Sequence, residues 1–289
     1  MTPEQIISNL DTKGYVVIPN VLSEDEVRHS LDLFHNWKDS IPNLEKMHNK
    51  VDPHGIFKFH QAGHQPHAWN IRTTPKIIDI YKTIWNTDEL SVSFDGCCWI
   101  PKNLKKKDNI WTHTDQAPNS KGLKCYQGFV ALTSNKERTL VVYKGSHKLH
   151  EKYFEDRGIK SSKNWQLIEH DYLKSIEDKR RCLNVPAGSL VLWDSRVFHQ
   201  NRYGKPMSEE RIVQYVCYLP KNNKGNTESQ KKKKLKYLNE LRTTSHWPYP
   251  IRVNSLQPPT YGDKSILIDY NSLPKPDLEN MMEDIMKLI

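Results

Sequence analysis

Apolar residues recur at helical spacing over the first part of the chain, with clear start signals. Pro3 to Leu10 predicts a short helix, and the β-branched stretch YVVIP (15–19) predicts a strand. A longer helix is expected over LSEDEVRHSLDLFHNW (22–37), because Ser23 and Glu26 have the spacing of a capping box. The first elements therefore alternate helix, strand and helix.

A further amphipathic helix is predicted over TTPKIIDIYKTIW (73–85), with Thr74 as its cap and Pro75 in its first turn. From Leu90 onward the pattern changes to short apolar runs separated by Gly, Pro, Asn and Ser. These runs are LSVSFDGCCWI, CYQGFVALT, TLVVYKGSH, RCLNVPAGSLVLWDSRVFH and RIVQYVCYLP. We expect a mainly β fold with flanking helices, either a sandwich or a barrel.

No internal repeat or long linker divides the chain, so a single domain over residues 1–289 is expected. Its core would span about residues 10–220. Residues 221–289 would be a C-terminal elaboration and a possible lid, closing with the helical pattern PDLENMMEDIMKLI.

Composition narrows the class of protein. The 289 residues are 36% hydrophobic, enough for a sizeable core, and the sequence shows neither a membrane span nor a signal peptide. A cytoplasmic location is therefore expected, with no particular oligomeric state. The five cysteines form no C-x-x-C pair, which favours reduced, mostly packed thiols.

The net charge of +9 is concentrated in KNLKKK (102–107) and QKKKKLKY (230–237). Solvated loops and a solvated helix face are the main interpretation of these lysines, and nucleic acid is a possible but less favoured partner.

The stretch IWTHTDQAP (110–118) carries the candidate chemistry. Side chains two positions apart on a strand share one face, so His113 and Asp115 could both point into a barrel. His199, in the strand-and-turn stretch GSLVLWDSRVFHQNR, is the best second histidine. Two histidines and one carboxylate form the face that holds iron(II). Arg211 begins the next strand and could clamp a carboxylate by a two-pronged contact.

Taken together, these stretches resemble the phytanoyl-CoA dioxygenase (PhyH) family of iron(II)- and 2-oxoglutarate-dependent oxygenases. The resemblance covers roughly residues 10–220 and rests on several stretches in the family's order: GYVVIPNVLSEDEV, H-x-D with Gln116, LVVYKGSH, SLVLWDSRVFHQNR and Arg211. It implies a double-stranded β-helix, a jelly roll whose sheets enclose the metal.

Residue by residue, the resemblance assigns iron to His113, Asp115 and His199, and the distal carboxylate of 2-oxoglutarate to Arg211. Gln127 falls where many relatives have a tryptophan lining the cosubstrate pocket. KERTL (136–140) stands where relatives often have a glycine-containing turn.

The implied reaction uses iron(II), 2-oxoglutarate and molecular oxygen to hydroxylate a small-molecule or lipid-like substrate, releasing succinate and carbon dioxide. Lys58, His60 and Trp69 are candidates for substrate or cosubstrate contact, with Lys58 placed on the cosubstrate side. Residues 145–147 (Gly-Ser-His) are expected to wall the pocket, and Arg242, His246 and Trp247 to belong to the lid.

Several residues carry a plainer interpretation as well. His147 is expected to be structural, and His60, His64 and His67 are expected to be surface histidines rather than a second metal cluster. Cys97 and Cys98 must point to opposite faces, Trp193 and Phe198 should be core, and Arg202 is either a substrate contact or an exposed charge.

For the whole chain, two functional alternatives stay open. One is a jelly-roll binding module without turnover, and the other is an oxygenase or binder acting on nucleic acid through the lysine-rich segments.

Overall fold

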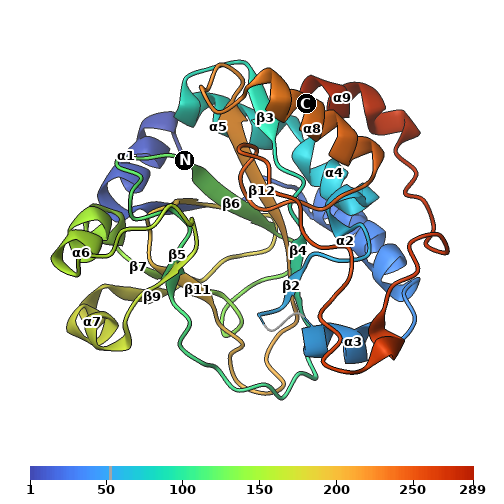
Figure 1. Cartoon of the computed structure of the whole chain (residues 1–289), viewed down its shortest axis with the longest axis horizontal. Helices are drawn as coiled ribbons and strands as arrows, with labels where there is room; N and C mark the ends of the chain where they lie inside the picture. The colour runs from blue at the N-terminus through green and yellow to red at the C-terminus, as the bar shows by residue number, and fades with distance from the viewer. Residues whose placement is uncertain (52–53) are drawn as a thin grey trace.

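The computed structural model describes residues 1–51 and 54–289, and within this part of the chain two antiparallel sheets face each other (Figure 1). The larger sheet runs in the order β1-β10-β6-β12-β4-β2, with β3 also paired to β12. Its strands are β1 (Tyr15–Ile18), β2 (Ile56–Phe57), β3 (Leu90–Val92), β4 (Cys97–Ile100), β6 (Tyr126–Ala131), β10 (Leu190–Asp194) and β12 (Arg211–Pro220). The smaller sheet, in the order β8-β5-β11-β7-β9, consists of β8 (Gln166–Leu167), β5 (His113–Thr114), β11 (His199–Asn201), β7 (Leu140–Tyr143) and β9 (Arg180–Cys182).

Helices from both ends of the chain cover the outer face of the larger sheet, and two more lie beside the smaller sheet (Figure 1). The first group includes α1 (Pro3–Lys13), α2 (Glu24–Asp39), α3 (Leu44–Val51), α4 (Pro66–Arg72), α5 (Pro75–Trp85), α8 (Glu228–Asn239) and α9 (Met282–Lys287). The second consists of α6 (His150–Asp156) and α7 (His170–Ser175).

Alternation along the strands divides the interior into two apolar layers. On β10, Leu190 and Leu192 face the helices, whereas Val191 and Trp193 face the space between the sheets. Neighbouring Cys97 and Cys98 divide in the same way, as predicted. The layer between the sheets is the one into which the candidate site is built.

The helix boundaries indicated by the sequence are confirmed for the start of α2. Ser23 and Glu26 form both bonds of the capping box of α2. Gly14 ends α1 in the left-handed region with φ 82°, where glycine is favoured because it has no Cβ. The mainly β architecture with flanking helices is also confirmed, and the paired sheets are consistent with a jelly roll.

The lysine-rich helix differs from its predicted form. Lys234 is only 3% exposed, and its ammonium contacts the Ser91 hydroxyl and donates to the Leu288 carbonyl over 3.3 Å. The chain end packs here as well, because Val92 N donates to the same carbonyl over 3.1 Å. The run 231–234 is therefore not a uniform solvated face. No helix in the described residues has the length and apolar character needed to cross a membrane.

Candidate metal centre

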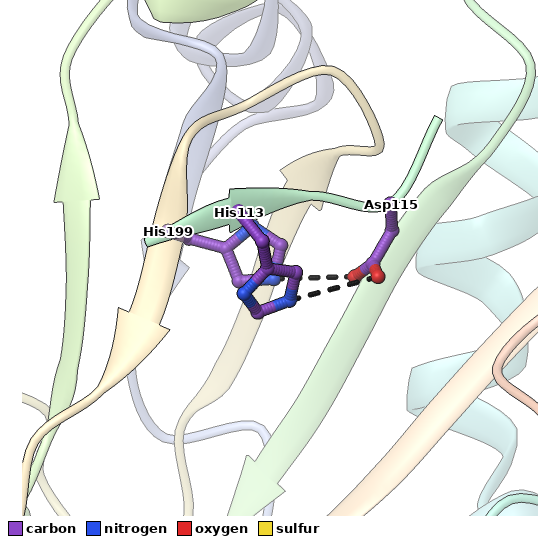
Figure 2. A group of neighbouring side chains, drawn as sticks. All are labelled: His113, Asp115 and His199. Carbon is purple, nitrogen blue, oxygen red and sulfur yellow. Dashed lines mark ion pairs between the residues drawn. The ribbon is translucent and has the colours of Figure 1, made fainter. Parts of the chain in front are cut away.

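His113, Asp115 and His199 meet between the two sheets (Figure 2). His113 and His199 are direct partners across the β5–β11 pair, and Asp115 follows β5 by one residue. The Nε2 atom of His113 lies 3.6 Å from Asp115 Oδ1, and the Nε2 atom of His199 lies 3.2 Å from Asp115 Oδ2. One ligand atom from each residue falls within 4.8 Å of the others, a spacing that fits a single metal ion.

Backbone carbonyls fix the orientation of both imidazole rings. His113 Nδ1 donates to the Trp111 carbonyl over 3.2 Å, and His199 Nδ1 donates to the Val197 carbonyl over 2.9 Å. A carbonyl oxygen only accepts hydrogen bonds, so Nδ1 carries the proton in each ring. When the imidazole is neutral, each Nε2 atom therefore presents its lone pair toward Asp115, as a metal ligand must.

Burial and mutual charge prepare these groups for ligation. Each of the three residues is 5–6% exposed. Burial, reinforced by the neighbouring His199 ring, lowers the pKa of His113. Burial acts to raise the pKa of Asp115, but the charges and hydrogen bonds of the two imidazoles in their protonated form outweigh it and hold this pKa well below its usual range. A neutral imidazole beside an ionised carboxylate is the combination that a divalent metal binds.

Gln127 lies against the carboxylate of this cluster. Its Nε2 atom donates to Asp115 Oδ2 over 3.1 Å, while its Oε1 atom is buried without a hydrogen-bond partner in the described residues. The structure thus places Gln127 beside the predicted metal ligand.

Arg211 is fully buried on the inner face of β12. Its Nε atom donates to Asn135 Oδ1 over 3.0 Å, and its Nη1 atom lies 3.1 Å from Cys98 Sγ. Its Nη2 atom is buried and has no hydrogen-bond partner within residues 1–51 and 54–289. The guanidinium stands 5.3 Å from the centre of the Phe129 ring. A buried cation with an unused donor between the sheets can bind a carboxylate.

Aromatic side chains surround the histidines, and three of them, Trp111, His54 and Trp165, were not predicted. Trp111 stacks on His113 with ring centres 4.8 Å apart, and His54 stacks on Trp111 at 3.6 Å. Trp165, half exposed, lies 5.4 Å from His113. Trp193 is buried as expected and also lies 5.4 Å from His199. Strand alternation could have indicated Trp111, which is two residues before His113, whereas His54 and Trp165 come from distant segments.

The three candidates from residues 54–72 lie in different surroundings. Lys58 is exposed, with its ammonium 5.7 Å from the centre of the Phe59 ring. His60 lines a cavity of about 480 Å³ between α3 and residues 263–273. Trp69 is fully buried and packs against Phe94 and His64. None of the contacts described for these side chains reaches the cluster.

The expectation of surface histidines at His60, His64 and His67 is wrong. They are 4%, 0% and 0% exposed, because this segment folds under α2 and against the larger sheet instead of forming a surface loop. They do not make a second metal site either. Within the described residues, the cluster of His113, Asp115 and His199 is the sole group of histidine, cysteine and carboxylate side chains with metal-ligand spacing.

The GSH stretch serves the fold. Ser146 Oγ accepts a hydrogen bond from Phe198 N over 2.8 Å, and His147 Nε2 donates to the Asp11 carbonyl over 3.0 Å. These bonds tie the stretch to α1 and to the strand end before His199. His147 is therefore structural, as predicted, and Phe198 is core.

Other charged candidates are paired. Arg202 is partly exposed and forms ion pairs with Asp108 and Glu137, each at 3.2 Å. Arg138 of the KERTL stretch is buried, where its guanidinium donates to carbonyl groups of the 100–104 segment. His246 contacts the Asp95 carboxylate through its Nδ1 atom.

Comparison with known proteins agrees with this architecture. A curated relative, "Ava biosynthesis cluster protein O" of Aspergillus versicolor, is 29% identical over 235 residues, covering 72% of this chain and 75% of the relative. The epimerase SnoN, solved with Fe3+, alpha-ketoglutarate and nogalamycin RO, superposes with a TM-score of 0.53 at 16% identity, covering 75% of this chain and 83% of SnoN. HygX from Streptomyces hygroscopicus, solved with nickel and 2-oxoglutarate, gives a TM-score of 0.53 at 16% identity over 77% and 88% of the two chains.

The two structural likenesses show a shared fold. The family itself is shown by the model of phytanoyl-CoA dioxygenase (PhyH), which matches residues 10–202 and so includes His113, Asp115 and His199. The chain belongs to the phytanoyl-CoA dioxygenase family of iron(II)- and 2-oxoglutarate-dependent oxygenases, and it is an enzyme of the oxidoreductase class.

Proposed function

We propose that this enzyme hydroxylates a small-molecule or lipid-like substrate, with 2-oxoglutarate converted to succinate and carbon dioxide. The observation that carries the proposal is the buried cluster of two imidazoles and one carboxylate, whose ligand atoms converge within 4.8 Å. This donor set fits iron(II), because three protein ligands on one face leave the remaining positions open. The name of the Aspergillus relative, a protein of a biosynthesis cluster, supports a small-molecule substrate.

In this proposal His113, Asp115 and His199 are the metal ligands. Bound iron with 2-oxoglutarate and oxygen would supply the oxidising chemistry that these side chains lack. The protein orients the ligands: the carbonyl groups of Trp111 and Val197 hold the imidazole rings. Gln127 holds the carboxylate through its hydrogen bond to Asp115 Oδ2. We therefore assign Gln127 to ligand orientation, next to its predicted role in the cosubstrate pocket.

Arg211 is the proposed binding group for the distal carboxylate of 2-oxoglutarate. Its guanidinium is held in place through Asn135 and Cys98, and the Nη2 atom, which has no hydrogen-bond partner among the described residues, can donate to an incoming carboxylate. The neighbouring Phe129 ring and the apolar residues between the sheets exclude water from the guanidinium and from a carboxylate bound to it. Lys58, exposed in this structure, stays a prediction for the cosubstrate side.

Measuring 2-oxoglutarate consumption and succinate formation tests the proposal. Wild-type enzyme supplied with iron(II) and oxygen should form one succinate for each 2-oxoglutarate consumed, and His199→Ala should form none while keeping its fold. The matched control is His147→Ala, since His147 is also 5% exposed but lies outside the cluster. Wild type that folds and binds metal but never consumes 2-oxoglutarate would instead support the binding module without turnover.

A further inference from the structure

Residues 243–246 form a segment that is held by hydrogen bonds to Gly63 and Phe94. This segment lies outside residues 10–202, which the family model matches. Thr244 N donates to the Phe94 carbonyl over 2.8 Å, and Phe94 N donates back to Thr244 Oγ1 over 3.0 Å. Gly63 N donates to Thr243 Oγ1 over 3.0 Å. Both threonines are buried. These bonds along Phe94 favour a fixed segment over the possible lid expected to include His246.

His246 ends this segment, and within the described residues only its Nδ1 atom has a polar contact. Its Nδ1 atom contacts Asp95 Oδ2, while Asp95 Oδ1 accepts a hydrogen bond from Gly96 N over 2.7 Å. No hydrogen bond to His246 Nε2 occurs in the part of the chain that the structure describes. The His246 side chain is 30% exposed, against 7% for Asp95. The carboxylate is thus enclosed, whereas the imidazole side chain is partly exposed.

Asp95 keeps this imidazole charged. Burial acts to lower the pKa of His246, but the charge and hydrogen bond of Asp95 outweigh it and raise the pKa to about 10. In the imidazolium form both ring nitrogens carry protons. Nε2 is therefore a hydrogen-bond donor throughout the neutral pH range.

The position of His246 relates it to the metal cluster. Its ring meets the Tyr215 ring edge-on, with centres 5.7 Å apart. Tyr215 lies on the inner face of β12, four residues and so about 13 Å along the strand from Arg211. Two residues further, Cys217 is the cross-strand partner of Gln127, which holds Asp115. His246 therefore lies at the Asp115 end of the space between the sheets, away from Arg211.

We propose that His246 is a substrate-binding residue whose Nε2–H donates to an anionic oxygen of the substrate, most simply a carboxylate, as that substrate approaches the metal cluster. The assignment rests on the proposed oxygenase function. A charge-assisted hydrogen bond of this kind favours substrates that carry such an oxygen over those that lack one.

Benzoate and benzyl alcohol are the probes for a direct test, with the full-length metal-free protein labelled with ¹⁵N in its histidines. Benzoate should shift the His246 Nε2 resonance saturably, and benzyl alcohol should bind at least about tenfold more weakly, since a hydrogen bond to a charged group contributes about 1.5–3 kcal/mol. His246→Asn and Asp95→Asn should each weaken benzoate binding about tenfold or more, the latter with the ring still present. The exposed His29→Asn is the matched control and should leave benzoate binding unchanged.

Equal benzoate binding by wild type and by folded Asp95→Asn, or a His246 Nε2 resonance that benzoate never shifts, would overturn the assignment. Benzoate could instead bind at Arg211 alone. In that case Arg211→Met would abolish benzoate binding, and wild type would show no shift of the His246 Nε2 resonance. That outcome would also contradict the assignment of His246. The readout needs neither iron nor turnover. An oxygenase assay without turnover would therefore contradict the proposed function without changing the benzoate result, so the two failures can be told apart.

Discussion

Gln127 donates a hydrogen bond from Nε2 to Oδ2 of Asp115 over 3.1 Å, and both side chains are buried. The same oxygen also faces His199 Nε2 at 3.2 Å. An amide that holds a ligand carboxylate in this way fixes which oxygen is available to a metal, and such outer partners support metal affinity.

Gln127→Leu should therefore weaken metal binding by roughly 10- to 100-fold while leaving the three proposed ligands in place. Isothermal titration of metal-free protein with iron(II) under nitrogen measures the change. Gln65→Leu removes a buried amide outside the cluster and should bind metal like wild type. An unaltered affinity in Gln127→Leu would mean that Asp115 is oriented by other groups.

Arg211→Met should raise the 2-oxoglutarate concentration needed for half-maximal turnover by roughly 10- to 100-fold, because a hydrogen bond to a charged group is lost. Iron binding should be unaffected, since Arg211 contacts Asn135 and Cys98 and none of the proposed ligands. Arg202→Met, which removes a partly exposed, ion-paired arginine, is the control. If the dependence on 2-oxoglutarate is the same in Arg211→Met and wild type, another cation binds the cosubstrate.

Because His67 is buried, we expect the free energy of unfolding to fall at acidic pH. Both of its ring nitrogens lack hydrogen-bond partners in the described residues, and burial, helped by Arg72, lowers its pKa to about 3. In the unfolded chain this imidazole takes up a proton near pH 6.5. Above that pH the ring is neutral in both the folded and the unfolded chain, so the free energy of unfolding has its full value with respect to His67. It falls as the pH decreases toward 3, at up to about 1.4 kcal/mol per pH unit.

His67→Phe should flatten this dependence between pH 6 and pH 4, because phenylalanine can fill the space beside Phe34 and Trp37 without titrating. Urea unfolding at a series of pH values gives the slopes, with exposed His29→Phe as the control. Parallel curves for His67→Phe and wild type would show that His67 is not the source of the effect.

Lys234 should destabilise the fold at neutral pH. Burial lowers its pKa well below the usual value, so the folded chain holds this proton less tightly than the unfolded chain does. The free energy of unfolding then rises as the pH increases toward 10.5, where the unfolded lysine also loses its proton. Lys234→Met should be more stable than wild type at pH 7 by about 1 kcal/mol or more, a gap that narrows at alkaline pH.

Thermal unfolding of Lys234→Met and of the exposed Lys233→Met at pH 7 and pH 10 provides the comparison. A Lys234→Met variant less stable than wild type at both pH values would mean that the bonds to Ser91 and Leu288 outweigh the burial cost.

Local signals in the sequence were sufficient for the helix starts, whereas the joining of His199 to His113 and Asp115 was predicted from the order of several stretches and the family resemblance. Ser23 and Glu26 cap α2 through short-range bonds, and strand alternation places His113 and Asp115 on one side. The burial of His67 and Lys234 was not accessible in this way. It depends on how distant helices pack, and neither residue lies in a periodic apolar pattern that would have indicated it.

The same limit applies around the histidines. The strand β5 is only two residues long, and His113 is held by its pairing with β11 and β8. Its neighbour Trp111 stacks on His54, which is 57 positions earlier in the chain. A contact of this kind joins segments that are far apart in the chain and cannot be deduced from spacing along the sequence.

The most direct test of the central claim is an anaerobic titration of metal-free protein with iron(II) and then 2-oxoglutarate, following the weak visible absorption of the chelate. Wild type and His147→Ala should develop the band, whereas His113→Ala, with a correctly folded chain, should not. A band of full strength in His113→Ala, or its absence in folded wild type that has been supplied with both components, would contradict the assignment of iron to this cluster.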